Sequence, residues 1–438
     1  MTAPAIEELR LTAFKSFREE TLRIAPLTVL IGRNSSGKSN ALDGLEVLSR
    51  LSRGEDVTEA LESRRSAAGP VRGGLAGCVP HGTDRFTLGC SVRTEQGDLV
   101  TLDVTVQVEP EVQIVEERLH GPTARGDKCL LSSGEPSPYA GDIQAMWHNG
   151  RPGRNPSGPF RNSRLLTSQL PLRIPGDSEG EREAIAAAES MLSALSSVFH
   201  LDPVPHLMRQ YVPARDVRIR RTAENLSAAV GRIERSDEAL FRRLVELLRS
   251  LTDHRIETLV VTRSELGDVM LALDEGDRGL TPAREMSDGT LRFLAIAASL
   301  LTGSSGLDLG LSSAGQRAEH SLMLVIEELE NGLHPSQASE VLRLVRQASD
   351  DNRARVLFTT HSPALLSALD SRDHEGVTVC SRDRDSGRSR LTRLTDLDGY
   401  PAAMAAGSLG EVITQGRLQA TRPSDRDFSE FDRMLGIG

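Results

Sequence analysis

The octapeptide GRNSSGKS, from Gly32 to Ser39, constrains the fold of this chain more than any other stretch. It follows the apolar run LTVLI at 27–31 and fits the pattern G-x-x-x-x-G-K-[ST]. Glycines in such a loop let backbone N–H groups close on phosphate oxygens, and a helix that starts behind the loop adds the positive end of its dipole. Apolar residues recur at helical spacing behind the loop and predict a helix from about Lys38 to Leu51. The sequence therefore predicts a strand, a phosphate-binding loop (P-loop) and a helix in that order.

Lysine is rare in this chain, and one lysine lies inside the loop. Of the 52 basic residues only three are lysines, at positions 15, 38 and 128. Lys38 is placed to reach the β and γ phosphates of a nucleotide, and the Ser39 hydroxyl is placed to bind Mg²⁺. We therefore expect ATP and Mg²⁺ as cofactors. The loop residues expected to contact the nucleotide are Gly32, Arg33, Asn34, Ser35, Ser36, Gly37, Lys38, Ser39 and Asn40.

A second apolar strand, LMLVI, runs directly into Glu327 and Glu328. A buried carboxylate is costly unless it is paired, so these two need a cation, a proton or a catalytic task. In a P-loop protein the first acid after such a strand binds Mg²⁺, and the second orients or deprotonates the attacking water. We therefore expect Glu327 to bind the metal together with Ser39, and Glu328 to act as the general base. The alternative is that both glutamates only cap the next turn.

Two further stretches carry candidate residues. The apolar strand RVLFTTHSP ends at His361, and parallel sheets bind ligands at the carboxyl ends of their strands. We therefore expect His361 to face the γ phosphate and to join Lys38 and Glu328 as a catalytic residue, although a lone histidine is often structural. In EMSDGTLRFLAIAASLL, at 285–301, Ser287 or Asp288 is expected to cap a helix with an apolar face.

In this order, the P-loop, the SDGT stretch from Ser287 to Thr290, VIEELENGLHP and TTHSP resemble the ABC-type ATPases of the RecF, SMC and OLD kind. Within that group, EELENGLHP and SDGTLRFLAIAASLL are most similar to bacterial OLD-like AAA ATPases of phage-defence and stress systems. The matching segments are 5–52 and 258–396. The resemblance implies an α/β fold, an ABC-type P-loop ATPase head with a mixed sheet, an antiparallel β meander and a helical, arginine-rich insertion.

The same resemblance implies a homodimer or higher oligomer that closes around ATP. In the family the signature loop of one subunit contacts the nucleotide of its neighbour, so Ser287 and Gly289 would complete a site in trans. The loop Asn331 to His334 would cross the interface. Leu329 stands where proline is common. The chain has no convincing Q-loop glutamine, so the sequence does not identify the residue that couples the nucleotide to the rest of the protein.

Composition narrows the class of protein further. A formal charge of −10 argues against nonspecific coating of nucleic acid, and four scattered cysteines without a CxxC predict neither a disulfide framework nor a zinc site. The start MTAPAIEELR is acidic where a signal peptide would be basic and then apolar, and no apolar run reaches the length of about 18 residues that a membrane span needs. We therefore expect a cytoplasmic protein with no membrane partner.

The middle of the chain is the least constrained part. Residues 120–180 are rich in Pro, Gly, Ser and Asn, which favours a solvated or disordered loop over a phosphate-tracking segment. Within 209–235 seven arginines accompany three acids, and this is the best nucleic-acid candidate, although a structural lid or a dimer surface is equally consistent. We treat 1–438 as one ABC-type ATPase domain. Its parts are a P-loop lobe with β meander, 1–119; an insertion or lid, 120–255; a lobe with signature, Walker B and H-loop, 256–414; and a tail, 415–438.

Asp383 and Asp385 could suggest a Toprim-like nuclease centre, but they lie between GVTVC and RLTRL, where a charged hairpin turn fits better. A nuclease or toxin effector is therefore expected on a separate polypeptide. The leading hypothesis is an ATP hydrolase whose ATP-dependent dimerisation drives or licenses a partner effector or a DNA transaction, in phage defence. A RecF-like DNA-binding repair ATPase is the alternative, and the ATPase subunit of a transporter fits less well.

Overall fold

The parallel centre of the sheet sets the geometry of this protein. The structure, a computed structural model, describes residues 3–62, 69–136, 141–252, 255–310, 322–332, 334, 337–350 and 354–414. Strand β3 (Leu27–Ile31) lies between β15 (Ala354–Thr360) and β16 (Val377–Arg382), and β14 (Leu322–Ile326) and β10 (Val198–Leu201) follow beyond β15, all parallel. The three apolar strands that were predicted to end at functional residues are therefore neighbours.

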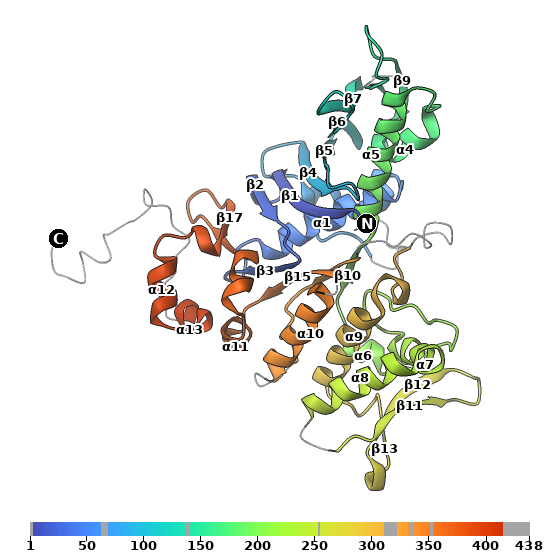
Figure 1. The fold of residues 1–438 in the computed structure, drawn as a ribbon, viewed down its shortest axis with the longest axis vertical. Helices are drawn as coiled ribbons and strands as arrows, with labels where there is room; N and C mark the ends of the chain where they lie inside the picture. Colours follow the sequence, from blue (N-terminus) through green and yellow to red (C-terminus); the bar gives the residue numbers. More distant parts are fainter. Residues whose placement is uncertain are drawn as a thin grey trace, which may run out of the picture.

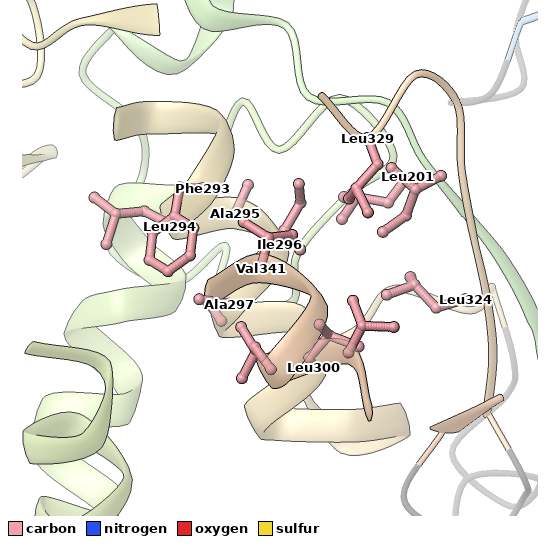
Figure 2. Packing of buried hydrophobic residues seen from close by; sticks show 14 of the residues in the cluster. Leu201, Phe293, Leu294, Ala295, Ile296, Ala297, Leu300, Leu324, Leu329 and Val341 are labelled. Atoms are coloured by element: carbon pink, nitrogen blue, oxygen red, sulfur yellow. The ribbon is translucent and has the colours of Figure 1, made fainter. Parts of the chain in front are cut away.

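Each of these parallel strands is buried on both faces, because successive side chains point to opposite sides of the sheet. On β14, Leu324 belongs to one core and Val325 to the other. The first core contains α9 (Asp288–Thr302) and α10 (Ala338–Asp350), and the second contains α1 (Lys38–Ser52). Figure 2 shows side chains of α9 gathered with side chains from β14 and α10 in the first core. The helix expected to carry the signature loop and the strand that ends in the paired glutamates thus share one packed core.

The sheet continues on the far side of β16, and its strand pairs there are antiparallel except for β17 and β2, which pair parallel. The strand order there is β16-β17-β2-β1-β4-β5-β6-β7-β8-β9. The bounds are β1 Ala5–Phe14, β2 Phe17–Arg23, β4 Arg85–Arg93, β5 Leu99–Gln107, β6 Gln113–Gly121, β7 Lys128–Pro136, β8 Asp142–Trp147, β9 Ser157–Arg161 and β17 Ser389–Arg393. Helices α4 (Leu166–Arg173) and α5 (Glu179–Ser196) accompany the meander β4–β9, which forms a distal lobe in Figure 1. The expected α/β class with a mixed sheet and a β meander is confirmed.

The expectation of a solvated or disordered loop over 120–180 is wrong for the described residues. Strands β7, β8 and β9 continue the meander there, and α4 follows. Leu131, Ile143 and Phe160 are buried in the second core and fix these strands, although Gly, Pro and Ser surround them in sequence. Pro159 is tolerated because β9 is the edge strand of the sheet. The lobe boundary expected at residue 119 falls inside β6, which runs from Gln113 to Gly121.

Smaller elements surround the first core and the P-loop side. A second sheet and several helices pack beside α9 (Figure 1). Their bounds are β11 Thr258–Arg263, β12 Val269–Asp274, β13 Leu280–Pro282, α6 Pro205–Met208, α7 Leu226–Ser236 and α8 Glu238–Leu251. The remaining helices are α2 Val57–Glu62, α3 Gly74–Cys78, α11 Pro363–Ser367, α12 Tyr400–Ala406 and α13 Leu409–Thr414. Among the described helices none combines the length and the apolar character that crossing a bilayer requires.

The C-terminal hairpin formed as expected. Strands β16 and β17 pair antiparallel, and the turn is held by Asp383, whose Oδ1 accepts hydrogen bonds from Ser386 N and Ser386 Oγ, each at 2.6 Å. The carboxylate of Asp383 therefore stabilises its own turn. The four cysteines are free thiols.

Candidate active site

The loop between β3 and α1 requires its two glycines. Gly32 has φ of 150° and Gly37 has φ of 113°, a region that residues with a Cβ rarely adopt. A Cβ at Gly32 would lie 2.1 Å from the carbonyl oxygen of Cys380, and one at Gly37 would lie 2.4 Å from Ser389 Oγ. The loop is thus pressed against the β16–β17 hairpin, so its backbone, rather than side chains, must line the phosphate site.

Lys38, the first residue of α1, folds back over this loop. Its Nζ donates to the carbonyl oxygens of Gly32 at 2.8 Å and Arg33 at 3.1 Å. Burial lowers the pKa of the Lys38 ammonium, and the negative charges of Glu328 and Glu330 oppose that shift. The ammonium therefore lies over the P-loop backbone with carboxylates nearby, which is where a group that neutralises phosphate charge is needed.

The two residues expected to bind Mg²⁺ meet across the sheet. Ser39 Oγ donates to Glu327 Oε2 at 3.0 Å, although the two lie 288 positions apart. A hydroxyl and a carboxylate are the hard oxygen ligands that Mg²⁺ prefers, and this ion commonly takes its other ligands from phosphates and water. Within the described ranges no group of three or more His, Cys, Asp or Glu side chains forms a complete metal cage. The pair therefore fits an ion that is shared with a nucleotide.

Arg72 joins this pair, and the sequence did not identify it. Its Nη2 lies 2.6 Å from Glu327 Oε1, and its Nη1 donates to Glu327 Oε2 at 3.1 Å. The same side chain donates twice to Asp43 Oδ1, at 2.8 and 3.0 Å, and Lys15 Nζ donates to Asp43 Oδ2 at 2.8 Å. Burial alone would lower the pKa of Arg72, but the hydrogen bonds that it donates to the carboxylates of Glu327 and Asp43 outweigh burial and raise the pKa above its ordinary value.

One signal in the sequence pointed to this network. Asp43 lies four residues after Ser39, on the same face of α1, and a carboxylate there needs a cation. Asp43 is only 1% exposed in the structure. Nothing local in the sequence selects Arg72 as its partner, because Arg72 comes from the segment between α2 and α3 and reaches Asp43 only after folding.

Glu328 is held in an uncommon backbone conformation. Its φ is 49°, in the left-handed region, which costs on the order of 1–3 kcal/mol for a residue that is not glycine. Two hydrogen bonds to Thr359 of β15 hold the turn, from Glu328 N to Oγ1 at 2.8 Å and from Leu329 N to the carbonyl oxygen at 3.1 Å. The carboxylate accepts a hydrogen bond from Asn331 Nδ2 at 2.6 Å. Such strain, maintained by neighbouring groups, is typical of functional sites.

Glu330 is a further carboxylate at this site, for which the sequence predicted no role. Its Oε1 accepts the main-chain N–H of His361 at 2.6 Å. Its Oε2 is buried and finds no donor among the described groups. Burial lowers the pKa of His361, the positive charge of Lys38 lowers it further, and the carboxylates of Glu330 and Glu328 oppose both effects. The His361 imidazole is therefore favoured in its neutral form.

Glu328, Glu330 and His361 line one pocket of about 400 Å³ at the carboxyl ends of β3, β14 and β15, and Lys38, Ser39 and Glu327 are not among its lining residues. Three separate parts of the sequence contribute to it. The residues that line the pocket are Arg33, Asn34, Glu328, Glu330, Asn331 and His361. The pocket thus brings together the P-loop, the turn after β14 that carries Glu328 and Glu330, and the end of β15 that carries His361. These three places were expected near a γ phosphate.

The signature residues lie elsewhere on the surface. Ser287 caps α9, and its Oγ accepts the Thr290 N–H at 3.1 Å. Neither Ser287 nor Gly289 lines the pocket. A Cβ at Gly332, within the loop expected to cross a subunit interface, would lie 3.2 Å from the Cα of Gly289. Leu333 of that loop lies outside the described residues. The structure therefore brings the two elements expected at an interface side by side.

The arginine-rich stretch 209–235 is largely engaged within the chain. Arg221 bonds Glu46 of α1, and Arg232 Nη1 donates to the carbonyl oxygen of Ser305 at 3.0 Å. Arg209 pairs with the signature helix at Asp288. These contacts favour the structural-lid interpretation of the stretch over the nucleic-acid interpretation.

A family model covers most of the elements that build this site. The model described as "AAA domain, putative AbiEii toxin, Type IV TA system" matches residues 27–107 and 182–367, which is more than half of the chain. The chain belongs to this family. The matched ranges include the P-loop, the signature helix, the paired glutamates and His361. The expectation of an OLD-like P-loop ATPase of the AAA type is confirmed at the level of the family.

The chain is also similar to individual proteins. The chain is 21% identical over 395 residues to an OLD nuclease from Thermus scotoductus, and the alignment covers 87% of this chain and 62% of the nuclease. The chain thus spans less than two thirds of the length of that relative. Among solved structures, an SMC head bound to the C-terminal winged-helix domain of ScpA aligns with a TM-score of 0.49 at 13% identity, covering 89% of this chain and 97% of the head. An SMC head domain from Thermotoga maritima aligns with a TM-score of 0.42 at 13% identity, covering 89% and 98%.

Proposed function

We propose that this AAA-family protein binds and hydrolyses Mg·ATP at the pocket between β3, β14 and β15, and that two copies pair around the nucleotide to license a separate effector in phage defence. The observation that carries the proposal is the convergence of Ser39, Glu327 and Glu328 with His361 at the ends of three adjacent parallel strands. Ligands of open α/β sheets bind at this edge.

Each residue has a role that its contacts support. Lys38 neutralises phosphate charge over the P-loop, and Ser39 and Glu327 hold the metal. Bound Mg²⁺ would offset the charge that develops on the phosphate oxygens. Glu328 accepts a proton from the attacking water, and Asn331 fixes the direction of its carboxylate. His361, favoured in its neutral form, offers a hydrogen bond toward the γ phosphate.

Pairing of two copies is supported by the position of the signature loop. Ser287 and Asp288 are exposed, the next residue, Gly289, lies beside Gly332, and none of the three lines the pocket of their own chain. A second copy that presents its signature loop to this pocket would complete the site. The partner effector is supported by the names of the relatives, since the family description mentions a toxin system and the curated relative is a nuclease.

A DNA transaction is the second candidate, because exposed arginines of the distal lobe favour it. Five arginines there are exposed, and no described acidic side chain pairs with them. They are Arg151, Arg154, Arg161, Arg164 and Arg173. Phosphate contacts of this kind bind nucleic acid without reading its sequence.

The test combines turnover with mass in solution. Purified protein with Mg·ATP is expected to hydrolyse ATP and to roughly double its mass, as light scattering measures, and the protein without nucleotide is expected to stay smaller. Stimulation of turnover by duplex DNA would favour the second candidate, and co-purification of a neighbouring gene product without DNA stimulation would favour the first. A folded protein that neither binds nor hydrolyses ATP would refute the proposed function.

A further inference from the structure

Arg209 holds the residues on both sides of Ser287. Its Nη2 donates to the carbonyl oxygen of Met286 at 2.8 Å and to Asp288 Oδ1 at 2.7 Å. Ser287 lies between these two contacts, with its Oγ bonded to the Thr290 N–H. We infer that Arg209 is the positioning residue of the signature loop, the group that fixes Ser287 for use at the nucleotide of a second copy of this chain. The inference rests on the proposed pairing of two copies.

The contacts of Arg209 are suited to this task. Met286 is 3% exposed, so the residue before Ser287 is anchored in the core as well as through its carbonyl. Asp288 has no such anchor, since its side chain is 61% exposed and extends from the first turn of α9. A hydrogen bond with a charged donor is shorter and stronger than a neutral one. Arg209 therefore holds Asp288, the neighbour of Ser287 that core packing leaves free.

The chain that carries Arg209 also reaches the P-loop helix. Residues 202–225 run from β10 to α7 and touch the signature loop through Arg209. Near the other end, Arg221 bonds Glu46, which is 5% exposed on α1 and also accepts from Arg50. Asn225 is fully buried and ties this end down, since its Nδ2 donates to the carbonyl of Asp216 at 2.9 Å. The segment 202–225 thus links α1, the P-loop helix, to the signature loop that would contact the nucleotide of a second copy. It could take the coupling role of a Q-loop, for which this chain has no recognisable glutamine.

A positioning role in trans makes a prediction that a purely structural role does not. Arg209→Ala alone is expected to lower ATP turnover by about 10- to 100-fold, because small misplacements of a contact group have effects of that size. ATP binding by the variant is expected to stay at the wild-type level, since Arg209 bonds Met286 and Asp288 and neither the P-loop nor the paired glutamates. Arg209→Lys, which keeps a charged donor, is expected to recover part of the turnover.

Mixing variants separates a role in trans from a role in cis. In a mixed dimer of Lys38→Ala and Arg209→Ala, one site carries both defects and the other carries neither. Because random pairing makes half of the dimers mixed, with one intact site each, a 1:1 mixture is expected to recover up to about a quarter of wild-type turnover. Failure of this mixture to exceed the sum of its two components would overturn the inference, because Arg209 would then act on its own subunit's site.

Two controls make the outcome specific. The mixture of Lys38→Ala with Ser287→Ala tests the trans site itself. If turnover does not recover in this mixture, the proposed pairing is contradicted. If turnover recovers here but not in the mixture with Arg209→Ala, only the inference about Arg209 is refuted. Arg232→Ala is the matched variant, since Arg232 bonds a main-chain carbonyl near the other end of α9, and its turnover is expected to stay near wild type. If Arg209→Ala fails to fold, Arg209→Gln enters the same mixture under the same criteria.

Discussion

Glu328→Gln is the perturbation that tests the proposed chemistry most directly, because it changes one atom and leaves its surroundings in place. The hydrogen bond from Glu328 N to Thr359 Oγ1 involves the main chain and is retained. A glutamine carbonyl oxygen can still accept from Asn331 Nδ2. Glu328 is exposed, so the free energy of unfolding is expected to change by no more than about 0.5 kcal/mol.

The chemical step should respond very differently. Loss of a general base slows proton transfer by about 10²-fold or more, which corresponds to about 2.7 kcal/mol in the barrier. ATP binding does not depend on that proton transfer and is expected to persist. ATP would then remain bound between two copies, so the paired species should accumulate. The assays are single-turnover hydrolysis and mass in solution, both with Mg·ATP.

Glu327→Gln is the matched comparison, because the neighbouring carboxylate has a different role. It removes an anionic metal ligand and weakens both contacts to Arg72, at 2.6 and 3.1 Å. Since loss of an outer-shell partner already costs 10- to 100-fold in metal affinity, Mg²⁺-dependent ATP binding should weaken by about 10-fold or more. Equal loss of binding in both variants would mean that the two carboxylates act together on the metal. Wild-type hydrolysis by Glu328→Gln would remove Glu328 from the mechanism.

Four further outcomes are expected. Lys38→Ala should abolish ATP binding in a folded protein, and unchanged affinity by calorimetry would refute the site. Ser287→Arg should spare ATP binding by the isolated subunit but block turnover and pairing; normal hydrolysis would leave Ser287 as a helix cap. Arg72→Ala should reduce the thermal stability of the metal-free protein, because among the described residues the buried Asp43 then keeps Lys15 as its one side-chain partner, and added Mg·ATP should restore part of the stability; an unchanged melting temperature would contradict this. Burial lowers the pKa of His200 to about 4 in the folded protein, so the unfolded chain binds more protons at this residue below pH 6.5. The free energy of unfolding should therefore fall as the pH drops from 6.5 toward 4. Urea unfolding of His200→Gln should show a weaker decline over the same range.

Much of the site could be predicted because its signals are local. The P-loop needs glycines at Gly32 and Gly37 for backbone reasons that act within a few residues, and these reasons are visible in the sequence. Ser287 caps α9 through a contact to Thr290, three residues away. The apolar runs that end at Glu327 and His361 were recognisable because strands buried on both faces read as continuous hydrophobic stretches.

The prediction failed where composition was used in place of pattern. The Pro- and Gly-rich stretch 120–180 suggested a loop, but three strands form there because Leu131, Ile143 and Phe160 reach the second core. Of the three strands only β9 lies at the edge of the sheet, where proline is tolerated. Sequence composition cannot show that a segment will lie at such an edge.

The sequence by itself determined the P-loop, the apolar strands that end at Glu327 and His361, and the cap of α9, since these follow from steric, hydrophobic and hydrogen-bonding rules that act over a few residues. Only the tertiary structure decided which side chains meet. Arg72 reaches Glu327 across 255 positions, Glu330 reaches the main chain of His361 across 31, and Arg209 reaches Asp288 across 79. Each of these is a charge that needs a partner in a partly buried place, and many partners in the chain would satisfy that need equally well. The choice among them is made by the order of the strands and the packing of the helices, which places one candidate within 3 Å and excludes the others.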